Sequence, residues 1–320
     1  PFEDISFSVE PVKFNESENL IEYVGELLDQ EGSIIGSAVL SSVLVNSEIG
    51  YSGRFELFEG KVLILQHDKD GSVVVDEIND SQFPACASKD PGEENRYAYK
   101  GNLEKHLKHN HKHNHVSDIH LIKADNTSSV EVSSDINILN ETTKIKVLIA
   151  YTADARVSAG GLAAIQAIVA NSILTSNQAY ANSEINNELE LAYSFEVDYE
   201  ENDDFLEQLY DLDGEKDGHM DEVHDLRDQY GADVVALLNA DNDYCGIAYL
   251  GFVPHENQMF SVTNYACAVG NLSFVHELGH NMGAAHDRNQ PGVGKYSYSH
   301  GYHIANNHSP TIMAYAPGTR

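Results

Sequence analysis

The sequence predicts an α+β protein with two unlike halves, and three observations support that class. Residues 1–103 carry alternating and β-branched runs with hairpin signals, which predict a β-rich unit. From Thr142 onward, strand patterns alternate with helical ones, which predicts a sheet covered by helices. Residues 104–141 are polar and rich in histidine and show no apolar pattern, so we expect an exposed linker there. The predicted domains are therefore 1–103, 104–141 and 142–320.

The sequence of residues 1–103 predicts β-strands and contains no group of residues with a catalytic pattern. The runs EGSIIGSAVLSSVLV (31–45) and KVLILQHDKDGSVVVDEI (61–78) are alternating or β-branched. Asp70 and Gly71 interrupt the second run, and Asp-Gly is a strong signal for a tight hairpin turn. We therefore expect two strands joined by a hairpin within residues 61–78.

The second half is expected to form a twisted mixed sheet with two long helices. The helical patterns cover residues 161–184 and 219–231, and Gly231 ends the second of them. Strands are expected around these helices, at residues 143–152, 188–199, 232–240, 246–252 and 259–266. The segment DLDGEKDGHMDE (211–222) departs from the EF-hand pattern, so a turn is favoured there and calcium is the weaker alternative.

Three histidines stand close together in the segment FVHELGHNMGAAHDRN, residues 274–289. His276 and His280 are four residues apart, so a helix places both imidazoles on one face. Gly283 is suited to the left-handed backbone that ends a helix, and the returning chain brings His286 as a third ligand. Three imidazoles that leave one position open suit a catalytic zinc ion, whose bound water has a pKa of about 7.

Glu277 and Met313 complete the predicted site. Glu277 lies beside the open position and is expected to act as the general base toward the zinc-bound water. A short HExxH pattern arises by chance, but the full HExxHxxGxxHD is far more specific. Met313, in SPTIMAY (309–315), supplies the methionine turn that accompanies this longer motif. The pattern therefore predicts hydrolysis of peptide bonds by water activated on zinc.

With these motifs the chain resembles the metzincin metallopeptidases, in their adamalysin or reprolysin-like branch. Asp287, directly after the third histidine, is the mark of that branch. The catalytic half looks like bacterial secreted enzymes of the peptidyl-Asp metallopeptidase type, over about residues 142–320. The similar segments are KVLIAYT (146–152), LRDQYGADVVALL (226–238), DYCGIAYLG (243–251), YACAVGNLSFVHELGHNMGAAHD (265–287) and TIMAY (311–315). The resemblance implies a metzincin catalytic domain that acts on proteins or peptides.

Tyr315 departs from the adamalysin pattern, which usually has no tyrosine two residues after the turn methionine. Astacins and serralysins have one, and there it ligates zinc or stabilises the transition state. The resemblance makes Tyr315 a candidate for the same role. The alternative is a packed tyrosine whose hydroxyl has found a partner.

The chain has three cysteines, so at least one of them is left without a disulfide partner in the chain. Cys245 and Cys267 bracket a short region of the catalytic half, which suits a disulfide. Cys86 then remains in the β-rich half, and its thiolate could occupy the fourth zinc position. That is the cysteine switch of several metzincin families, and it makes residues 1–103 a prodomain that inhibits its own enzyme. The alternatives are a structural thiol, or Cys86 paired with one of the other two cysteines.

Composition limits the partners. The chain has 320 residues, with 19 basic and 51 acidic ones and a net charge of −32. This charge argues against nucleic acid and against anionic membranes as partners. No run approaches 18 apolar residues, so no membrane helix is expected, and we expect a monomer. The chain opens with Pro1, so we expect a signal segment to have preceded it in a secreted, extracellular protein.

Two other functions remain open at this point. One is a catalytically inactive binding module on the metzincin fold, although the presence of Glu277 argues against it. The other is a metal-binding protein that uses the histidine-rich linker, whose six histidines lie at 106, 109, 111, 113, 115 and 120. A latent zinc endopeptidase, activated by cleavage in that linker, is the function that we predict.

Overall fold

The structure is a computed structural model that describes most of both predicted halves. The described residues are 8–17, 19–78, 83–84, 86, 142–202, 204–251, 258–290, 292, 294–304 and 309–315. The predicted linker at 104–141, with its histidines, lies outside them. Among the helices in the described part, none has the length and apolar character that crossing a bilayer would require.

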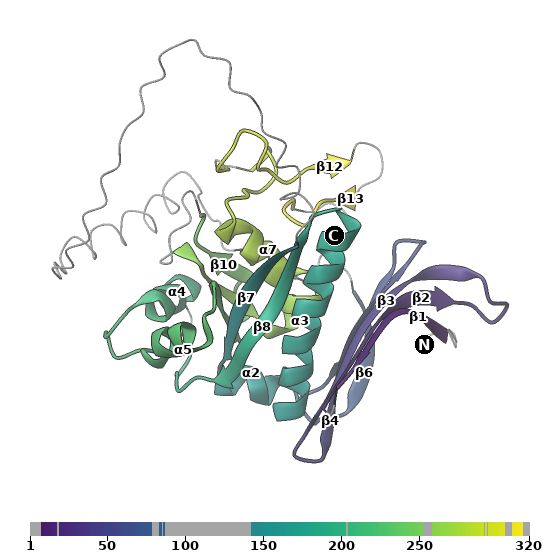
Figure 1. Cartoon of the computed structure of the whole chain (residues 1–320), viewed down its shortest axis with the longest axis horizontal. Helices are drawn as coiled ribbons and strands as arrows, with labels where there is room; N and C mark the ends of the chain where they lie inside the picture. Colours follow the sequence, from purple (N-terminus) through teal and green to yellow (C-terminus); the bar gives the residue numbers. More distant parts are fainter. Residues whose placement is uncertain are drawn as a thin grey trace, which may run out of the picture.

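The first half forms a six-stranded antiparallel sheet in which each strand pairs with the next along the chain (Figure 1). Its strands are β1 Ser8–Glu16, β2 Leu20–Leu28, β3 Ile34–Val45, β4 Glu48–Leu57, β5 Val62–His67 and β6 Val73–Ile78. The predicted hairpin is confirmed, because β5 and β6 pair on either side of a turn in which Gly71 has a φ of 83°. A positive φ is easily adopted by glycine alone, which explains the Asp70-Gly71 sequence.

The second half contains a five-stranded sheet in the order β10-β11-β9-β7-β8. Its strands are β7 Thr143–Tyr151, β8 Asn187–Glu196, β9 Val234–Asn239, β10 Gly246–Ala248 and β11 Phe260–Asn264. Four of these strands run parallel, and β10 is antiparallel to β11 at one edge. The predicted mixed sheet is therefore present, and each of its strands was anticipated by a pattern in the sequence.

Helices cover both faces of this sheet. They are α2 Ala153–Ser158, α3 Leu162–Asn182, α4 Phe205–Asp213, α5 Glu222–Tyr230, α6 Tyr265–Gly270 and α7 Ser273–Asn281. One core lies between the sheet and α3, α6 and α7, and a second lies between the opposite face and α4 and α5. A small hairpin, β12 His303–Ile304 and β13 Ser309–Pro310, follows the last helix.

The prediction of two long helices is wrong for the described part of the chain. The first helix is 21 residues long, but the second begins at Glu222 and has 9 residues. The segment before it cannot be helical, because Gly218 and Met220 have φ values of 91° and 50°. Gly231, with a φ of 61°, ends the helix as predicted. The first three residues of the expected turn at 211–222 belong to α4, which the sequence analysis did not identify.

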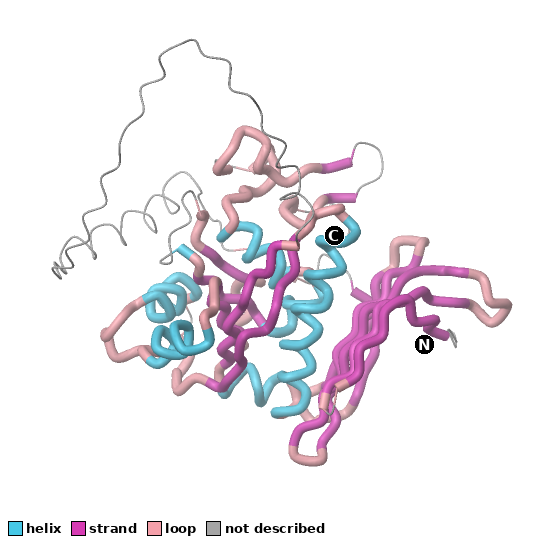
Figure 2. The backbone as a smooth tube through the Cα atoms, viewed as in Figure 1, coloured by secondary structure: helices cyan, strands magenta, loops and turns pink. Residues whose placement is uncertain are grey.

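The six-stranded sheet lies against α3, so this helix is held between two sheets (Figures 1 and 2). Val62 and Ile64 of β5 belong to the same core cluster as Val147 and Ile149 of β7. The cluster therefore extends from one sheet to the other past α3. This layering places the first half directly against α3, and the shared core also includes residues of α7, the helix that carries two of the predicted zinc ligands.

Candidate active site

The predicted zinc helix is present as α7, and its sequence explains where it ends. Gly283 follows the helix with a φ of 94°, a backbone conformation that few side chains tolerate. The chain then reverses, so that Ala285 pairs with His300 and His286 faces the helix. The turn predicted at Gly283 thus gives the third histidine its position.

The three histidine rings converge on one point. The Nε2 atoms of His276 and His280 are 3.1 Å apart, and that of His286 lies 3.1 Å from the first and 3.0 Å from the second. All three side chains are buried. The Nδ1 atom of His276 lies 2.7 Å from the carbonyl oxygen of Ile312, and that of His280 lies 2.7 Å from the carbonyl oxygen of Ala284.

These contacts fit a bound cation. A carbonyl can only accept, so each Nδ1 donates its proton and the Nε2 atoms of His276 and His280 carry lone pairs. Lone pairs that face one another repel, and a metal ion between them removes that repulsion. A ring nitrogen held by a backbone carbonyl is the usual arrangement of a metal-binding histidine. The residues therefore suit zinc, and their assignment as its ligands stays a prediction.

Glu277 is fully buried beside the histidines. It lies next to Gly246, the first residue of β10, where an added Cβ would come within 2.6 Å of the carboxylate. The absence of a side chain at Gly246 therefore makes room for Glu277 against the edge strand. Gly246 was not predicted from the sequence as part of the site, although it directly follows Cys245.

Met313, predicted to form a methionine turn, packs against α7. A Cβ added to Gly279 would lie 2.4 Å from the Met313 sulfur. Gly279 is the glycine within HELGH, so the motif itself contains the small residue that lets the turn approach the helix. The carbonyl of neighbouring Ile312 then reaches His276.

Asp287 joins the two ends of the site. Its carboxylate accepts from the backbone N–H of Asn289 at 3.0 Å and of Tyr315 at 3.2 Å, and it lies 3.5 Å from His303 Nε2. Burial raises the pKa of this carboxyl, but the two N–H donors and His303 outweigh it and lower the pKa below its usual value. A charged Asp287 therefore fixes the segment after Met313 to the segment after His286.

Tyr315 lies beside the histidines, with its ring centroid 4.2 Å from that of His286. Its hydroxyl donates to the carbonyl oxygen of Cys86 at 3.3 Å. The tyrosine is thus close enough to the site for the predicted role. In this structure its hydroxyl also contacts the first half of the chain.

Cys86 comes from the first half and enters the same cluster. Its sulfur is buried, 3.0 Å from Glu277 Oε1 and 4.0 Å from His280 Nε2. The ligand atoms of Cys86 and the three histidines all lie within 4.8 Å of one another. The odd cysteine count and the resemblance to families with a cysteine switch predicted this position for a residue that stands 190 residues before His276.

The predicted disulfide between Cys245 and Cys267 is confirmed. It joins the residue before β10 to α6, with the two Cα atoms 5.4 Å apart. Pairing of Cys86 with either of these cysteines, one of the alternatives left open above, is therefore wrong.

The part of the chain that carries the three histidines matches a known protein family. A profile described as Metallo-peptidase family M12, of reprolysin type, matches residues 141–320, which is more than half of the chain. The chain belongs to metallo-peptidase family M12. The predicted resemblance to reprolysin-like metallopeptidases is thus confirmed, and the M12 match includes all three histidines and Glu277.

Several bacterial proteins that share one name are similar to this chain. A peptidyl-Asp metalloendopeptidase of Xanthomonas campestris is 35% identical over 173 residues, covering 54% of this chain and 40% of that protein. A protein of the same name from Stenotrophomonas maltophilia is 35% identical over 175 residues, covering 53% and 41%. One from Pseudomonas aeruginosa is 30% identical over 215 residues, covering 59% and 34%. The chain thus spans less than half the length of these curated relatives.

Proposed function

We propose that this chain is a secreted zinc-dependent endopeptidase in a latent form. The observation that carries the proposal is the cluster of three buried histidines whose Nε2 atoms lie within 3.1 Å of one another beside Glu277. Membership of family M12 supports zinc as the metal and protein as the substrate. The disulfide supports secretion, because structural disulfides persist in oxidising compartments.

The residues of the chain then have separate tasks. His276, His280 and His286 would hold zinc, which supplies a polarised water and a Lewis acid when it is bound. Glu277 takes a proton from the attacking water and delivers it to the leaving amine. We assign to the hydroxyl of Tyr315 the role of donating to the oxygen of the scissile carbonyl as charge develops there, and the nearness of its ring to His286 supports that role.

Latency is supported by the position of Cys86. Its sulfur lies 3.0 Å from Glu277 Oε1 and 4.0 Å from His280 Nε2, close to both groups that the attacking water would contact in the proposed mechanism. The Tyr315 hydroxyl, to which we assign a contact with the substrate, donates to the carbonyl oxygen of Cys86 instead. The first half thus contacts three of the groups that catalysis requires, and a cut in the predicted linker would free the Cys86 segment to leave.

The substrate class follows from the relatives and from the charge of the chain. Their shared name refers to aspartate, and we extend that preference to this enzyme. Residues 288–320 contain no Asp or Glu, in a chain that has 51 such residues. This stretch includes Arg288 and Lys295, and two of its described residues, His300 and Tyr315, contact His286. A sequence segment without acidic side chains that begins two residues after the third histidine favours an acidic peptide over a basic one.

The decisive experiment replaces Glu277 by Gln in the full chain, with Glu222→Gln on the exposed side of α5 as the matched control. After limited trypsin cleavage, casein hydrolysis by E277Q should fall by about 10²–10⁴-fold because the general base is lost. Zinc content should remain one per chain in both variants. Full activity of purified E277Q would contradict the proposed mechanism, and several weakly bound ions per chain would favour a metal-binding protein.

A further inference from the structure

The longest helix in the described part of the chain has no exposed charged face. Helix α3, LAAIQAIVANSILTSNQAYAN, contains no Asp, Glu, Lys or Arg, although 22% of the chain is charged. Fourteen of its 21 residues are buried. A helix that is buried on more than one side is expected to lack a polar stripe, because it has few positions in contact with water. The sequence of α3 is therefore suited to permanent cover on both sides.

The cover on one side is the mixed sheet, and on the other it is the sheet β1–β6 (Figure 1). Strand β4 approaches the helix so closely that a Cβ on Gly50 would lie 1.8 Å from the carbonyl oxygen of Ala163. Farther along, Asn171 Nδ2 donates to Ser52 Oγ at 3.1 Å, and both side chains are buried. These contacts match the packing inside a domain, where backbone meets backbone and buried polar groups are paired.

A second contact reaches the junction just before the zinc helix. The guanidinium group of Arg54, on β4, is 2% exposed and donates to the carbonyl oxygen of Gly270 and, at 2.7 Å, to Glu56. Gly270 is the last residue of α6, where carbonyl groups have no partner within their own helix. A Cβ on Gly270 would lie 3.2 Å from the side chain of Ile78 and 3.5 Å from that of Ile64. The first half thus supports the backbone that leads into α7.

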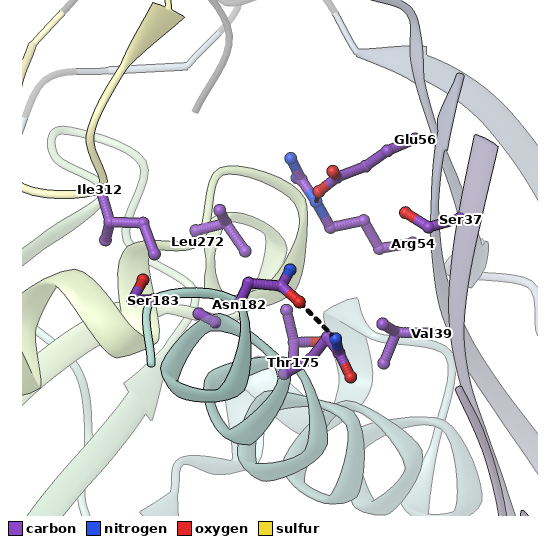
Figure 3. A pocket seen from close by; sticks show the side chains of 11 residues that line it. Ser37, Val39, Arg54, Glu56, Thr175, Asn182, Ser183, Leu272 and Ile312 are labelled. Atoms are coloured by element: carbon purple, nitrogen blue, oxygen red, sulfur yellow. Dashed lines mark hydrogen bonds and ion pairs between the residues drawn. The ribbon is translucent and has the colours of Figure 1, made fainter. Parts of the chain in front are cut away.

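The interface between the sheet β1–β6 and α3 is tightly packed near one end of the helix and contains a cavity near the other end. Figure 3 shows Arg54 and Glu56 of β4 on one wall of a cavity and Thr175 and Asn182 of α3 on the other. The cavity has a volume of about 200 Å³, and Leu272 and Ile312 also line it. The close contact at Gly50 lies near the opposite end of α3, so that end is where a substitution should separate the two parts.

From these contacts we infer that the sheet β1–β6 remains bound to α3 and α6 after the linker is cut. The active enzyme is then a complex of two fragments, in which only the segment around Cys86 leaves the site. The inference rests on the proposed function for the cut within 104–141. It goes beyond that function because it makes the first half a lasting subunit of the enzyme, with Arg54 as a residue that positions the start of the zinc helix.

The test uses the full chain with Cys86→Ala, so that no thiol ties the first half to the metal. The linker is cut by limited trypsin cleavage. Size-exclusion chromatography at low and at high salt then shows whether the fragment with β1–β6 has separated from the catalytic fragment. We expect both fragments to elute together in equal amounts under both conditions. Elution of the catalytic fragment alone would overturn the inference. Casein hydrolysis is measured separately, so co-elution without activity would contradict the proposed function and leave this inference standing.

A pair of variants locates the interface. Gly50→Val places a side chain where the Ala163 backbone lies, and we expect it to release the first half after cleavage. Glu48→Val adds the same side chain two residues earlier on β4, at an exposed position, and should leave co-elution unchanged. If Gly50→Val prevents folding of the uncut chain, Asn171→Ala takes its place and should raise the released fraction. Equal release by the control and by these variants would assign the binding to another surface and overturn the inference.

Discussion

Cys86 is the residue on which the latent state depends. Its sulfur lies 3.0 Å from Glu277 Oε1, so its removal should admit water to the site. The uncut Cys86→Ala chain is therefore expected to hydrolyse casein about tenfold faster than the uncut wild type, a change of ~1.4 kcal/mol in the barrier. Cys86→Ser, which keeps a small polar side chain, should give an intermediate rate because a hydroxyl is a poorer zinc ligand than a thiolate. A silent Cys86→Ala chain would show that the first half blocks the site by its bulk.

Protonation of the half-buried Glu201 makes the free energy of unfolding depend on pH. Burial raises the pKa of this carboxyl above 4.5, and nearby Asp154 and Asp241 add to the effect, which outweighs hydrogen bonds from Thr152 and Ala240. The folded chain thus keeps this proton to a higher pH than the unfolded chain does. The contribution of Glu201 to the free energy of unfolding therefore falls as pH rises from about 4.5 through the raised pKa.

Urea unfolding between pH 4 and pH 8 tests this. Relative to wild type, Glu201→Gln should gain stability as pH rises across that interval and then level off, because glutamine does not titrate. Glu207→Gln, at an exposed position on α4, should run parallel to wild type throughout. Parallel curves for Glu201→Gln as well would mean that Glu201 is solvated in the folded chain.

Single residues of the site were predictable because their positions follow from short-range rules. The spacing of His276 and His280 fixes them on one helical face, and Gly283 signals the turn that brings His286 back. Gly246 and the carbonyl of Ile312 could not be predicted in this way. Their contacts depend on how β10 and the methionine turn pack against α7, and no local pattern records that packing.

At the level of elements, the disulfide fixes the edge strand that faces Glu277. It joins Cys245, just before β10, to Cys267 of α6, 22 residues away. The double variant Cys245→Ala/Cys267→Ala should lower the free energy of unfolding by about 3 kcal/mol, the effect expected for a loop of this length. Activity should also fall, because Gly246 then packs less firmly against Glu277.

Urea unfolding with and without reductant checks that effect. The midpoint for wild type should drop on reduction to that of the double variant, which itself should not respond to reductant. An unchanged midpoint after reduction would contradict a stabilising role for this disulfide.

Elements were predictable where a pattern was long and unbroken. Strands β7 and β9 and helix α3 have such patterns, and the turn at Gly71 has its own signature. The length of α5 was not predictable, because the left-handed backbone at Met220 depends on packing around a residue with no preference for it. The docking of β4 on α3 left only a weak signal: a glycine such as Gly50 within a strand is consistent with close approach of another backbone, but it does not say which element approaches.

At the scale of the whole molecule, the net charge of −32 opposes folding through self-repulsion. Raising the salt from 0.01 to 1 M shortens the Debye length from about 30 to about 3 Å and screens this repulsion. We therefore expect the midpoint of thermal unfolding of the full chain to rise with NaCl, by about 2–4 °C for each kcal/mol gained. A series with sucrose at matched osmolality serves as the control, because sucrose screens no charge. A midpoint that falls with salt would show that ion pairs such as Arg156 with Glu196 outweigh the repulsion between like charges.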